Sequence, residues 1–360
     1  MDYSFAGLHQ DDRFRWFADG LRTVMDRHGH TWVDDPDAAK LVVNFFRGAE
    51  PRPFRRRAQA VFLAGVADVD GPFDSHLVHG YPLLIRSLSN LFIALVDGEA
   101  QDPDIHFVTP EQGHYVVAGN CDRPQYFEQV YRRIEPLASS RLVIDNVFDE
   151  DLPEALWNGD GITESIHRAG QHLNELELLP APFPMHEYLT ERDIRHLKRL
   201  YGLGGLSYGN LSARLDETRF WMSASGVDKS NLRVIGRDIL LVKDYDPERN
   251  AMLLSVPPGV EPRRVSVDAI EHWMIYREHP DVGAILHVHA WMHGVPSTEF
   301  NYPCGTRELG QAVADIVRTA DDPARAVVGL KNHGLTITGR SLDEIFERVD
   351  GKLLQTVPMS

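Results

Sequence analysis

The sequence predicts an α/β protein with two domains. Short apolar runs of strand length alternate with segments whose apolar residues recur at helical spacing. At 360 residues the chain is long enough for two domains that each bury a core of their own. Three prolines fall between Leu178 and Glu187, where neither a helix interior nor a central strand would tolerate them. We therefore expect an N-terminal domain at residues 1–180 and a C-terminal domain at residues 186–360.

The N-terminal half contains a mixture of predicted helices and strands. Two apolar runs flank Pro110-Glu111-Gln112-Gly113, a favourable turn, and together they predict a hairpin. These elements indicate a separate α/β or α+β domain, and no motif in it indicates a chemistry. Helices are predicted at residues 14–29, 81–88 and 126–134, and strands at residues 41–46, 60–66, 91–96, 106–109, 114–117 and 141–145.

The histidines and arginines of this half form no pattern that indicates a binding site. The histidines show no ligand spacing, so we interpret each as a core or surface residue. A cluster of arginines is interpreted as a solvated loop rather than an anion site. The residues concerned are His76, His79, His106 and His114, together with Arg52, Arg55, Arg56 and Arg57.

The C-terminal half begins with a helix that Thr190 caps and that ends near Leu200. The helix before it, at about residues 164–176, can pack with either domain. Further along, apolar runs predict short strands, and a helix follows Val265. The predicted strands lie at residues 220–223, 239–242, 284–288 and 326–330, and the helix extends to about residue 278.

A His-x-His motif lies in the predicted strand that starts at Ala284. Side chains two residues apart on a strand point to the same face, so His287 and His289 are directed at one spot. Two imidazoles at this spacing provide two ligands of a three-histidine metal site. The motif alone is weak support for metal binding and needs further ligands elsewhere in the chain.

A glycine-rich segment at residues 204–214 follows the helix that ends near Leu200. We interpret it as a turn, whose backbone amides can approach a ligand closely and to which serine and asparagine side chains add donors. Such a nest of amides suits a phosphate or a carboxylate. A Gly-Asn turn by itself is more often only a turn.

Composition limits the possible partners and the compartment. The formal charge of −16 and pI near 5.5 argue against a general nucleic-acid binder, although an anionic small molecule can still bind in a locally positive or amide-lined pocket. Cys121 and Cys304 form no pairing pattern, which fits a reducing compartment, and we favour a structural role for Cys304 over a nucleophilic one. No secretory signal and no apolar stretch of membrane-spanning length is visible, so we expect a cytoplasmic protein without a membrane partner.

Five short motifs occur in a specific order in the C-terminal half. Their joint order resembles the class II aldolase/adducin family over about residues 186–350, roughly half of the chain. The match is far more specific than any one motif. The motifs are Gly-Asn-Leu-Ser-Ala-Arg from Gly209, Ser-Gly-Val from Ser225, Ser-x-Asp from Ser266, His-x-His from His287 and Asn-His-Gly from Asn332.

The resemblance implies a three-layer α/β/α domain with a mainly antiparallel sheet. It also implies that His287, His289 and His333 bind one divalent metal, most often Zn²⁺, with Mn²⁺, Co²⁺ or Fe²⁺ as alternatives. Members of the family are commonly homo-oligomers, and we expect the same here. Three neutral imidazoles and one carboxylate leave a coordination position open, which is typical of a catalytic metal.

Asp268 has two interpretations. From its position alone it is a helix-start residue that interacts with the helix dipole. The resemblance implies that it lies beside the metal as a ligand or as a base. Many aldolases have glutamate at this position, and aspartate resembles the epimerase branch instead. In the sugar-phosphate enzymes, the remaining matched positions bind the substrate phosphate; here they are Gly209, Asn210, Ser225, Gly226 and Ser266.

The resemblance also has a gap. The aldolases carry a longer segment after His-x-His, which includes a catalytic tyrosine donated across a subunit interface. Here only residues 290–304 fill that place, so this tyrosine has no clear counterpart, and Tyr302 cannot be assigned its role from sequence.

The expected function is a metal-dependent lyase. It would cleave or form a C–C bond through a metal-stabilised enediolate in a phosphorylated sugar or a similar hydroxy-ketone, with Asp268 moving a proton. A sugar-phosphate epimerase, dehydratase or decarboxylase would use the same site. Two alternatives come from other classes: an iron-dependent oxygenase, since histidines and a carboxylate also hold redox metals, and a non-enzymatic adducin-like assembly module.

Overall fold

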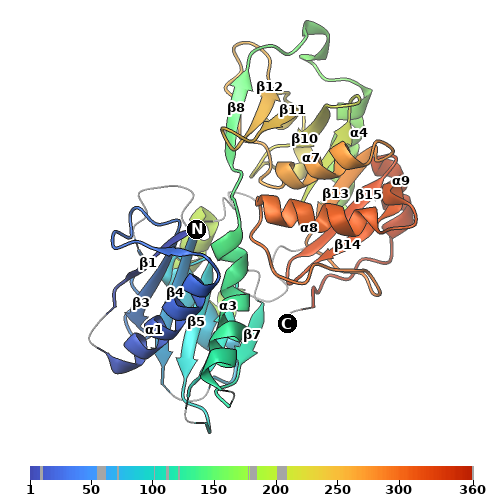
Figure 1. Ribbon diagram of the computed structural model, residues 1–360. Helices are drawn as coiled ribbons and strands as arrows, with labels where there is room; N and C mark the ends of the chain where they lie inside the picture. The colour runs from blue at the N-terminus through green and yellow to red at the C-terminus, as the bar shows by residue number, and fades with distance from the viewer. Residues whose placement is uncertain are drawn as a thin grey trace. The chain divides into compact units, whose positions relative to one another are not determined.

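The computed structural model describes two compact units. Unit 1 comprises residues 1–140 and 183–200, and unit 2 comprises residues 141–182 and 201–358. The α/β class expected from the sequence is confirmed, because each unit contains a sheet with helices (Figure 1). The residues described are 1–360 without 9–10, 55–61, 71–72, 101, 111–112, 121, 177, 179–184, 201–208 and 359–360.

Unit 1 is built on a seven-stranded sheet in the order β2-β1-β3-β4-β5-β6-β7. The first five strands in this order are parallel, and β6 and β7 add an antiparallel hairpin. The interior strand β5 is buried along its whole length, as expected of a strand covered on both faces. The strands are β1 (Asp2–Ala6), β2 (Thr31–Trp32), β3 (Leu41–Arg47), β4 (Phe62–Val69), β5 (Leu91–Val96), β6 (Asp104–Val108) and β7 (His114–Val117).

Helices cover this sheet. Helices α1 and α3 pack against each other, and α6 packs against α2. The contact between α2 and α6 includes a two-pronged ion pair, in which Arg86 donates to the buried carboxylate of Asp193 at 2.8–3.2 Å. The helices are α1 (Asp12–Arg27), α2 (Tyr81–Ser87), α3 (Arg123–Ser139), α5 (Met185–Tyr188) and α6 (Glu191–Leu200), with a π-helical turn at His76–Gly80 before α2.

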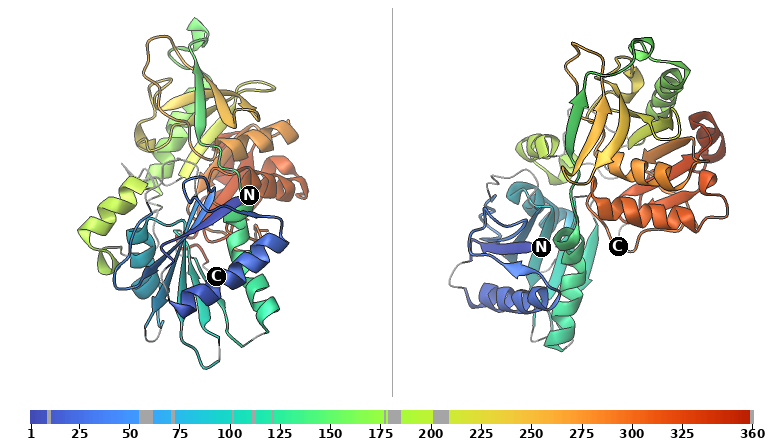
Figure 2. Two further views of the ribbon diagram at one scale, coloured as in Figure 1. Left: turned by 60° about the vertical axis from the view of Figure 1, so that its left-hand side comes forward. Right: turned by 45° about the horizontal axis from the view of Figure 1, so that its top comes forward.

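Unit 2 contains an eight-stranded sheet in the order β14-β15-β13-β9-β10-β11-β12-β8. All neighbouring pairs are antiparallel except β12 and β8, which are parallel. The strands can be followed from two further directions in Figure 2. They are β8 (Asp145–Asp149), β9 (Gly209–Arg214), β10 (Phe220–Ser223), β11 (Ile239–Asp246), β12 (Ala251–Ser255), β13 (Ala284–Val288), β14 (Val327–Leu330) and β15 (Gly334–Gly339).

Helices lie on both faces of this second sheet and make three layers. On one face α7 (Ala269–Glu278) and α8 (Arg307–Arg318) pack side by side (Figure 1). Helices α4 (Gly161–Glu175) and α9 (Leu342–Val349) pack together and contact the central strands β9 and β13. The core between the layers includes Trp221, Ile285 and Leu286, all fully buried.

Two segments belong to other units than the proline-based domain boundary predicted. Residues 141–182 belong with unit 2, because β8 pairs with β12 and because α4 packs on β9 and β10. Helix α6, expected at the start of the C-terminal domain, belongs with unit 1 through its contact with α2. The strand predicted at residues 141–145 is wrong in position, since β8 starts at Asp145.

The segment that contains the Gly-Asn motif is a strand and not a turn. Residues 209–214 form β9, which pairs with β13 and β10 in the middle of the sheet, and residues 204–208 of the predicted turn lie outside the described residues. Gly209 has a φ of +136°, and a Cβ there would lie 1.9 Å from the carbonyl oxygen of His287. Glycine at the start of β9 therefore reflects close strand packing, which a turn-based interpretation missed.

Several elements were not predicted at all. They include β12, β15, α8 and α9, of which β15 is the strand that follows the Asn-His-Gly motif. Within the part of the chain that the structure describes, no helix combines the length and the apolar character needed to cross a membrane.

Candidate active site

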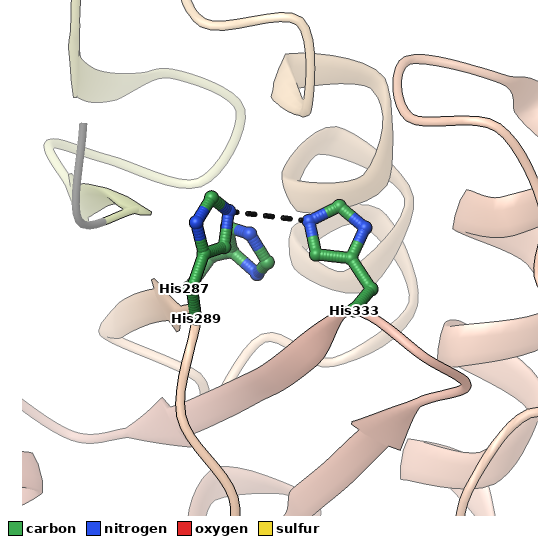
Figure 3. Close-up of side chains that lie close together, drawn as sticks. All are labelled: His287, His289 and His333. Atoms are coloured by element: carbon green, nitrogen blue, oxygen red, sulfur yellow. Dashed lines mark hydrogen bonds between the residues drawn. The ribbon is translucent and has the colours of Figure 1, made fainter. Parts of the chain in front are cut away.

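Three histidines meet at one end of β13. One ring nitrogen from each of His287, His289 and His333 lies within 4.8 Å of the other two (Figure 3). His287 is on β13, His289 follows directly after the strand ends, and His333 is in the turn between β14 and β15. The Nε2 atoms of His289 and His333 are 3.3 Å apart. The structure thus brings together all three histidines that the sequence analysis selected.

The Asn-His-Gly motif places the third histidine. Asn332 adopts a left-handed conformation with φ +59°, which asparagine tolerates better than most residues. A Cβ at Gly334 would lie 2.2 Å from the carbonyl oxygen of Val288, so only glycine lets β15 begin this close to the end of β13. The two strands then pair from Val288 and Leu335 onward, and His333 lies beside the His-x-His motif.

Backbone contacts fix the orientation of His287. Its Nδ1 lies 3.1 Å from the carbonyl oxygen of Leu335 and donates a hydrogen bond to it. The Nε2 atom is buried and has no hydrogen-bond partner. A ligating histidine commonly donates its second ring nitrogen to a carbonyl in this way, which leaves the other nitrogen unprotonated for the metal.

All three imidazoles are held neutral. Burial lowers the pKa of His289 and His333 to about 3, and repulsion between neighbouring histidines adds to the effect. The pKa of His287 lies well below its ordinary value for the same two reasons. Neutral imidazole is the form that binds metal, and a buried ring nitrogen without a hydrogen-bond partner is free to bind a cation. The residues present therefore fit a divalent metal ion.

Asp268 is not a helix cap. It occupies the N-cap position of α7, but its side chain makes no capping hydrogen bond. Its carboxylate instead accepts from Nδ2 of Asn210 at 2.6 Å and from the backbone amide of Gly305. Burial raises its pKa to about 6, against the opposing effect of these two hydrogen bonds. The structure therefore gives no support to the interpretation of Asp268 as a side-chain cap, and the role of base that the resemblance implies stays a prediction.

Asp268 does not belong to the histidine cluster itself. Among the described residues, the group of ligand atoms within 4.8 Å of one another contains the three histidines and no carboxylate. This geometry favours the interpretation of Asp268 as a base beside the cluster over that of a direct ligand.

Alternate residues of β9 all bond to α7. Asn210 donates to Asp268, Ser212 shares hydrogen bonds with His272 and Tyr276 at 2.8 and 2.9 Å, and Arg214 donates to the carbonyl oxygen of Tyr276 at 2.8 Å. Residues two apart on a strand share a face, so the polar positions of Gly-Asn-Leu-Ser-Ala-Arg form one row under the helix. The motif therefore positions α7 and, with it, Asp268.

The sequence analysis missed a second carboxyl group on the same helix. Glu271 is 1% exposed, and its Oε1 accepts a 2.5 Å hydrogen bond from the hydroxyl of Thr336. Burial, followed by the charge of Asp268, raises its pKa to about 8, and the hydrogen bond from Thr336 opposes this rise. The signal was the spacing of three residues from Asp268, which places both carboxyl groups on one face of a helix.

The positions expected to bind phosphate lie on adjoining segments. The amide of Ser225 donates to the carbonyl of Arg264 at 2.8 Å, and that of Ser266 donates to the carbonyl of Ser223 at 3.2 Å, so the two loops run side by side. These two amides are consequently engaged within the protein, contrary to the expected nest of free amides. Gly226 is exposed with φ +66°, and the side-chain amide of Asn210 is directed to Asp268.

The short segment after His289 contains a thiol that contacts the cluster. Sγ of Cys304 lies 3.2 Å from Nδ1 of His333, so this cysteine adjoins the site and is free of any disulfide. Tyr302 packs its ring against that of Phe300 at 5.9 Å, and its role stays open. Cys121 lies outside the described residues.

Solved structures similar to this chain include an aldolase and a protein described as a possible one. The L-fuculose-1-phosphate aldolase of Thermus thermophilus is 18% identical, with a TM-score of 0.33, over 52% of this chain and 86% of that protein. YgbL of Escherichia coli, described as a putative aldolase/epimerase/decarboxylase, is 17% identical, with a TM-score of 0.34, over 53% and 85%.

Curated relatives share more sequence. A methylthioribulose-1-phosphate dehydratase of Klebsiella pneumoniae is 26% identical over an alignment of 174 residues, and the match covers 40% of this chain and 79% of that enzyme. The enzyme of the same name from Pseudomonas aeruginosa is 35% identical over 106 residues, or 29% and 46%. Residues 194–300 match the family model of the Class II Aldolase and Adducin N-terminal domain. The resemblance to the class II aldolase/adducin family is therefore confirmed for residues 194–300 of the C-terminal half.

Proposed function

We propose that this protein is a metal-dependent lyase that removes water from a phosphorylated keto sugar or a similar hydroxy-ketone. The observation that carries the proposal is the cluster of three neutral histidines with the buried carboxylate of Asp268 beside it. C–C cleavage was the first expectation from the sequence. The two curated relatives described above are dehydratases, and they support elimination of water as the reaction instead.

The chemistry of the donor set suits a divalent cation, with Zn²⁺ as the first choice because imidazole ligands favour it. When bound, such a cation would polarise the substrate carbonyl and stabilise the negative charge that develops on its oxygen. His287, His289 and His333 would hold it, and the hydrogen bond to the carbonyl of Leu335 would keep the ring of His287 in its ligating orientation.

Asp268 would act as the base. Its pKa of about 6 keeps it ionised at neutral pH. Because this pKa is close to neutral pH, the carboxylate is also basic enough to accept a proton from the carbon next to the carbonyl. Loss of the hydroxyl on the following carbon then completes the elimination. The hydroxyl leaves as water when it receives a proton. Asp268 can return to it the proton taken from carbon, so that the reaction consumes and releases no net proton.

The substrate phosphate would lie against the two adjoining loops. The hydroxyls of Ser225 and Ser266, together with Gly226 and Gly209, are the groups that we assign to it. Hydroxyls and backbone would thus replace Lys and Arg, which fits a protein with a formal charge of −16.

Aldol cleavage is the second candidate. It needs the same proton chemistry and differs only in the leaving group, and the family model that matches residues 194–300 is named for class II aldolases. The two reactions give different products, since dehydration removes one water and cleavage yields two fragments.

The test starts from protein purified without chelator. Metal content is measured first, and the protein is then incubated with a panel of phosphorylated ketoses whose products are identified by mass spectrometry. We expect about one divalent metal per chain and a product lighter by one water. His333→Ala should lose metal and activity together, while His172→Ala, a surface histidine that pairs with Asp350, should keep both. Metal-free wild-type protein, or full metal content in His333→Ala, would contradict the proposal.

A further inference from the structure

Helix α7 buries two carboxyl groups one turn apart. Asp268 is 6% exposed and Glu271 is 1% exposed. In the described part of the chain, neither forms an ion pair with a lysine or an arginine. Buried carboxyl groups are almost always paired, because an isolated buried charge is very unfavourable. Two of them on one helix face must either stay protonated or balance a cation that the protein's own side chains do not supply.

Both groups lie next to the same histidine. Asn210, His287 and Thr336 are direct cross-strand neighbours on β9, β13 and β15, so their side chains form one row on the face under α7. Asp268 bonds to one end of the row, at Asn210, and Glu271 bonds to the other end, at Thr336. The two carboxyl groups therefore flank His287.

Glu271 is also incompletely bonded. Its Oε1 accepts from Thr336, but its Oε2 is buried and has no hydrogen-bond partner. An oxygen in that condition is unfavourable unless a further partner is present. Accepting the hydroxyl of Thr336 accounts for only one of the two oxygens, so a purely structural role leaves the other unexplained.

We propose that Glu271 is the second anionic group that balances the charge of the bound divalent cation. The three neutral histidines contribute no charge, and Asp268 contributes one negative charge, which leaves one positive charge buried. Glu271 loses its proton when the cation binds and then supplies the missing negative charge, without joining the ligand cluster. This inference rests on the proposed function, because it assumes that the three histidines hold a divalent metal.

Glu271→Gln separates charge from structure. Glutamine keeps the length of the side chain and an oxygen that accepts from Thr336, while an uncharged NH2 group takes the place of Oε2. The matched control is Glu278→Gln, which makes the same chemical change on the same helix at a partly exposed residue that pairs with Arg318.

The readout is the dissociation constant for Zn²⁺, measured by competition with a chromophoric chelator and independent of activity. We expect Glu271→Gln to weaken Zn²⁺ binding by roughly 10- to 100-fold, as for other groups around the ligands of a metal site. Glu278→Gln should stay within about twofold of wild type, as for surface substitutions in general.

The Zn²⁺ affinities of the wild-type protein and of Glu271→Gln distinguish failure of this inference from failure of the proposed function. Wild-type affinity in Glu271→Gln overturns the inference alone, whereas a wild-type protein that binds no Zn²⁺ overturns the proposed function. If Glu271→Gln does not fold, the double variant Glu271→Met with Thr336→Val replaces both hydrogen-bonding partners by apolar groups of similar shape, a change that proteins tolerate well. Its Zn²⁺ affinity is then read against the same two outcomes.

Discussion

At the scale of single residues, the carboxylate of Asp268 determines how the site responds to pH. It is buried and receives hydrogen bonds from Asn210 and Gly305. We expect Asp268→Asn to keep the fold and to lower kcat by about a hundredfold or more, as for loss of a general base. Asp268→Glu should recover part of the activity. A near-normal rate in Asp268→Asn, in steady-state assays with metal content checked, would leave the base unidentified.

The pH profile follows from the same group. A base with a pKa of about 6 is active when ionised, so kcat/KM should fall as the pH drops through about 6. Asn210 stabilises the ionised form and lowers this pKa. In Asn210→Ala the pKa should therefore rise, and the acid limb of kcat/KM against pH should move to higher pH.

Ser225→Ala serves as the comparison for Asn210→Ala. Ser225 is exposed and is assigned to the substrate phosphate, so its loss should raise KM and leave the position of the acid limb unchanged. An Asn210→Ala limb that coincides with wild type would show that the contact with Asp268 has no influence on the base.

The histidine cluster could be predicted at this scale, whereas the spacing of Glu271 from Asp268 was too weak a signal to single it out. Strand periodicity places His287 and His289 together, and the motif order supplied His333. An acidic residue in the first turn of a helix is ordinarily read as favourable to the dipole. Only the structure shows that Glu271 points inward to Thr336.

At the scale of elements, the contact between α2 and α6 provides a test in acid. Although burial opposes it, hydrogen bonds from Arg86 and Thr190 lower the pKa of Asp193 to about 2 from 3.8. A lowered pKa means that the stabilisation is complete above the unfolded value and is lost as the pH falls from about 4 to about 2.

Arg86→Met should remove this stabilisation. At neutral pH it should lower the free energy of unfolding by about 1–3 kcal/mol, because it leaves a buried carboxylate without its charged partner. The difference from wild type should shrink as the pH falls from about 4 toward 2, which denaturant titrations at several pH values would reveal. Arg195→Met, which removes an exposed pair with Glu191 on the same helix, should have little effect. A pH-independent difference would contradict this account.

Secondary structure was predictable where local signals agree with the fold. The strands at residues 91–96 and 284–288 combine apolar runs with deep burial and were predicted at their observed positions. For β9, glycine and asparagine signal a turn locally, but pairing with β13 and β10 overrides that signal. The segment at residues 141–145 was misplaced because Leu142 makes only an isolated bridge to Thr306.

At the scale of the whole molecule, the metal should stabilise one unit selectively. All three histidines lie in unit 2, and a ligand present at a hundredfold its Kd stabilises the folded state that binds it by about 2.7 kcal/mol. Hydrogen exchange read by mass spectrometry should therefore slow in peptides from β13 and β15 when Zn²⁺ is added. Peptides from β3 and β5 in unit 1 should be unaffected. Equal slowing in both units would mean that Zn²⁺ binds at another site or non-specifically, and not at the three histidines alone.

The row of hydrogen bonds between β9 and α7 also has a bearing on how this scaffold could be re-engineered. The sheet and its turns hold the three histidines, whereas Asp268 directly precedes the ten-residue helix α7 and Glu271 lies within it. Asn210, Ser212 and Arg214 hold that helix in place through hydrogen bonds, so we expect residues 265–278 to be replaceable as one segment. Replacing this segment with the corresponding one from relatives that catalyse a different reaction would exchange the acidic groups and leave the three histidines unchanged.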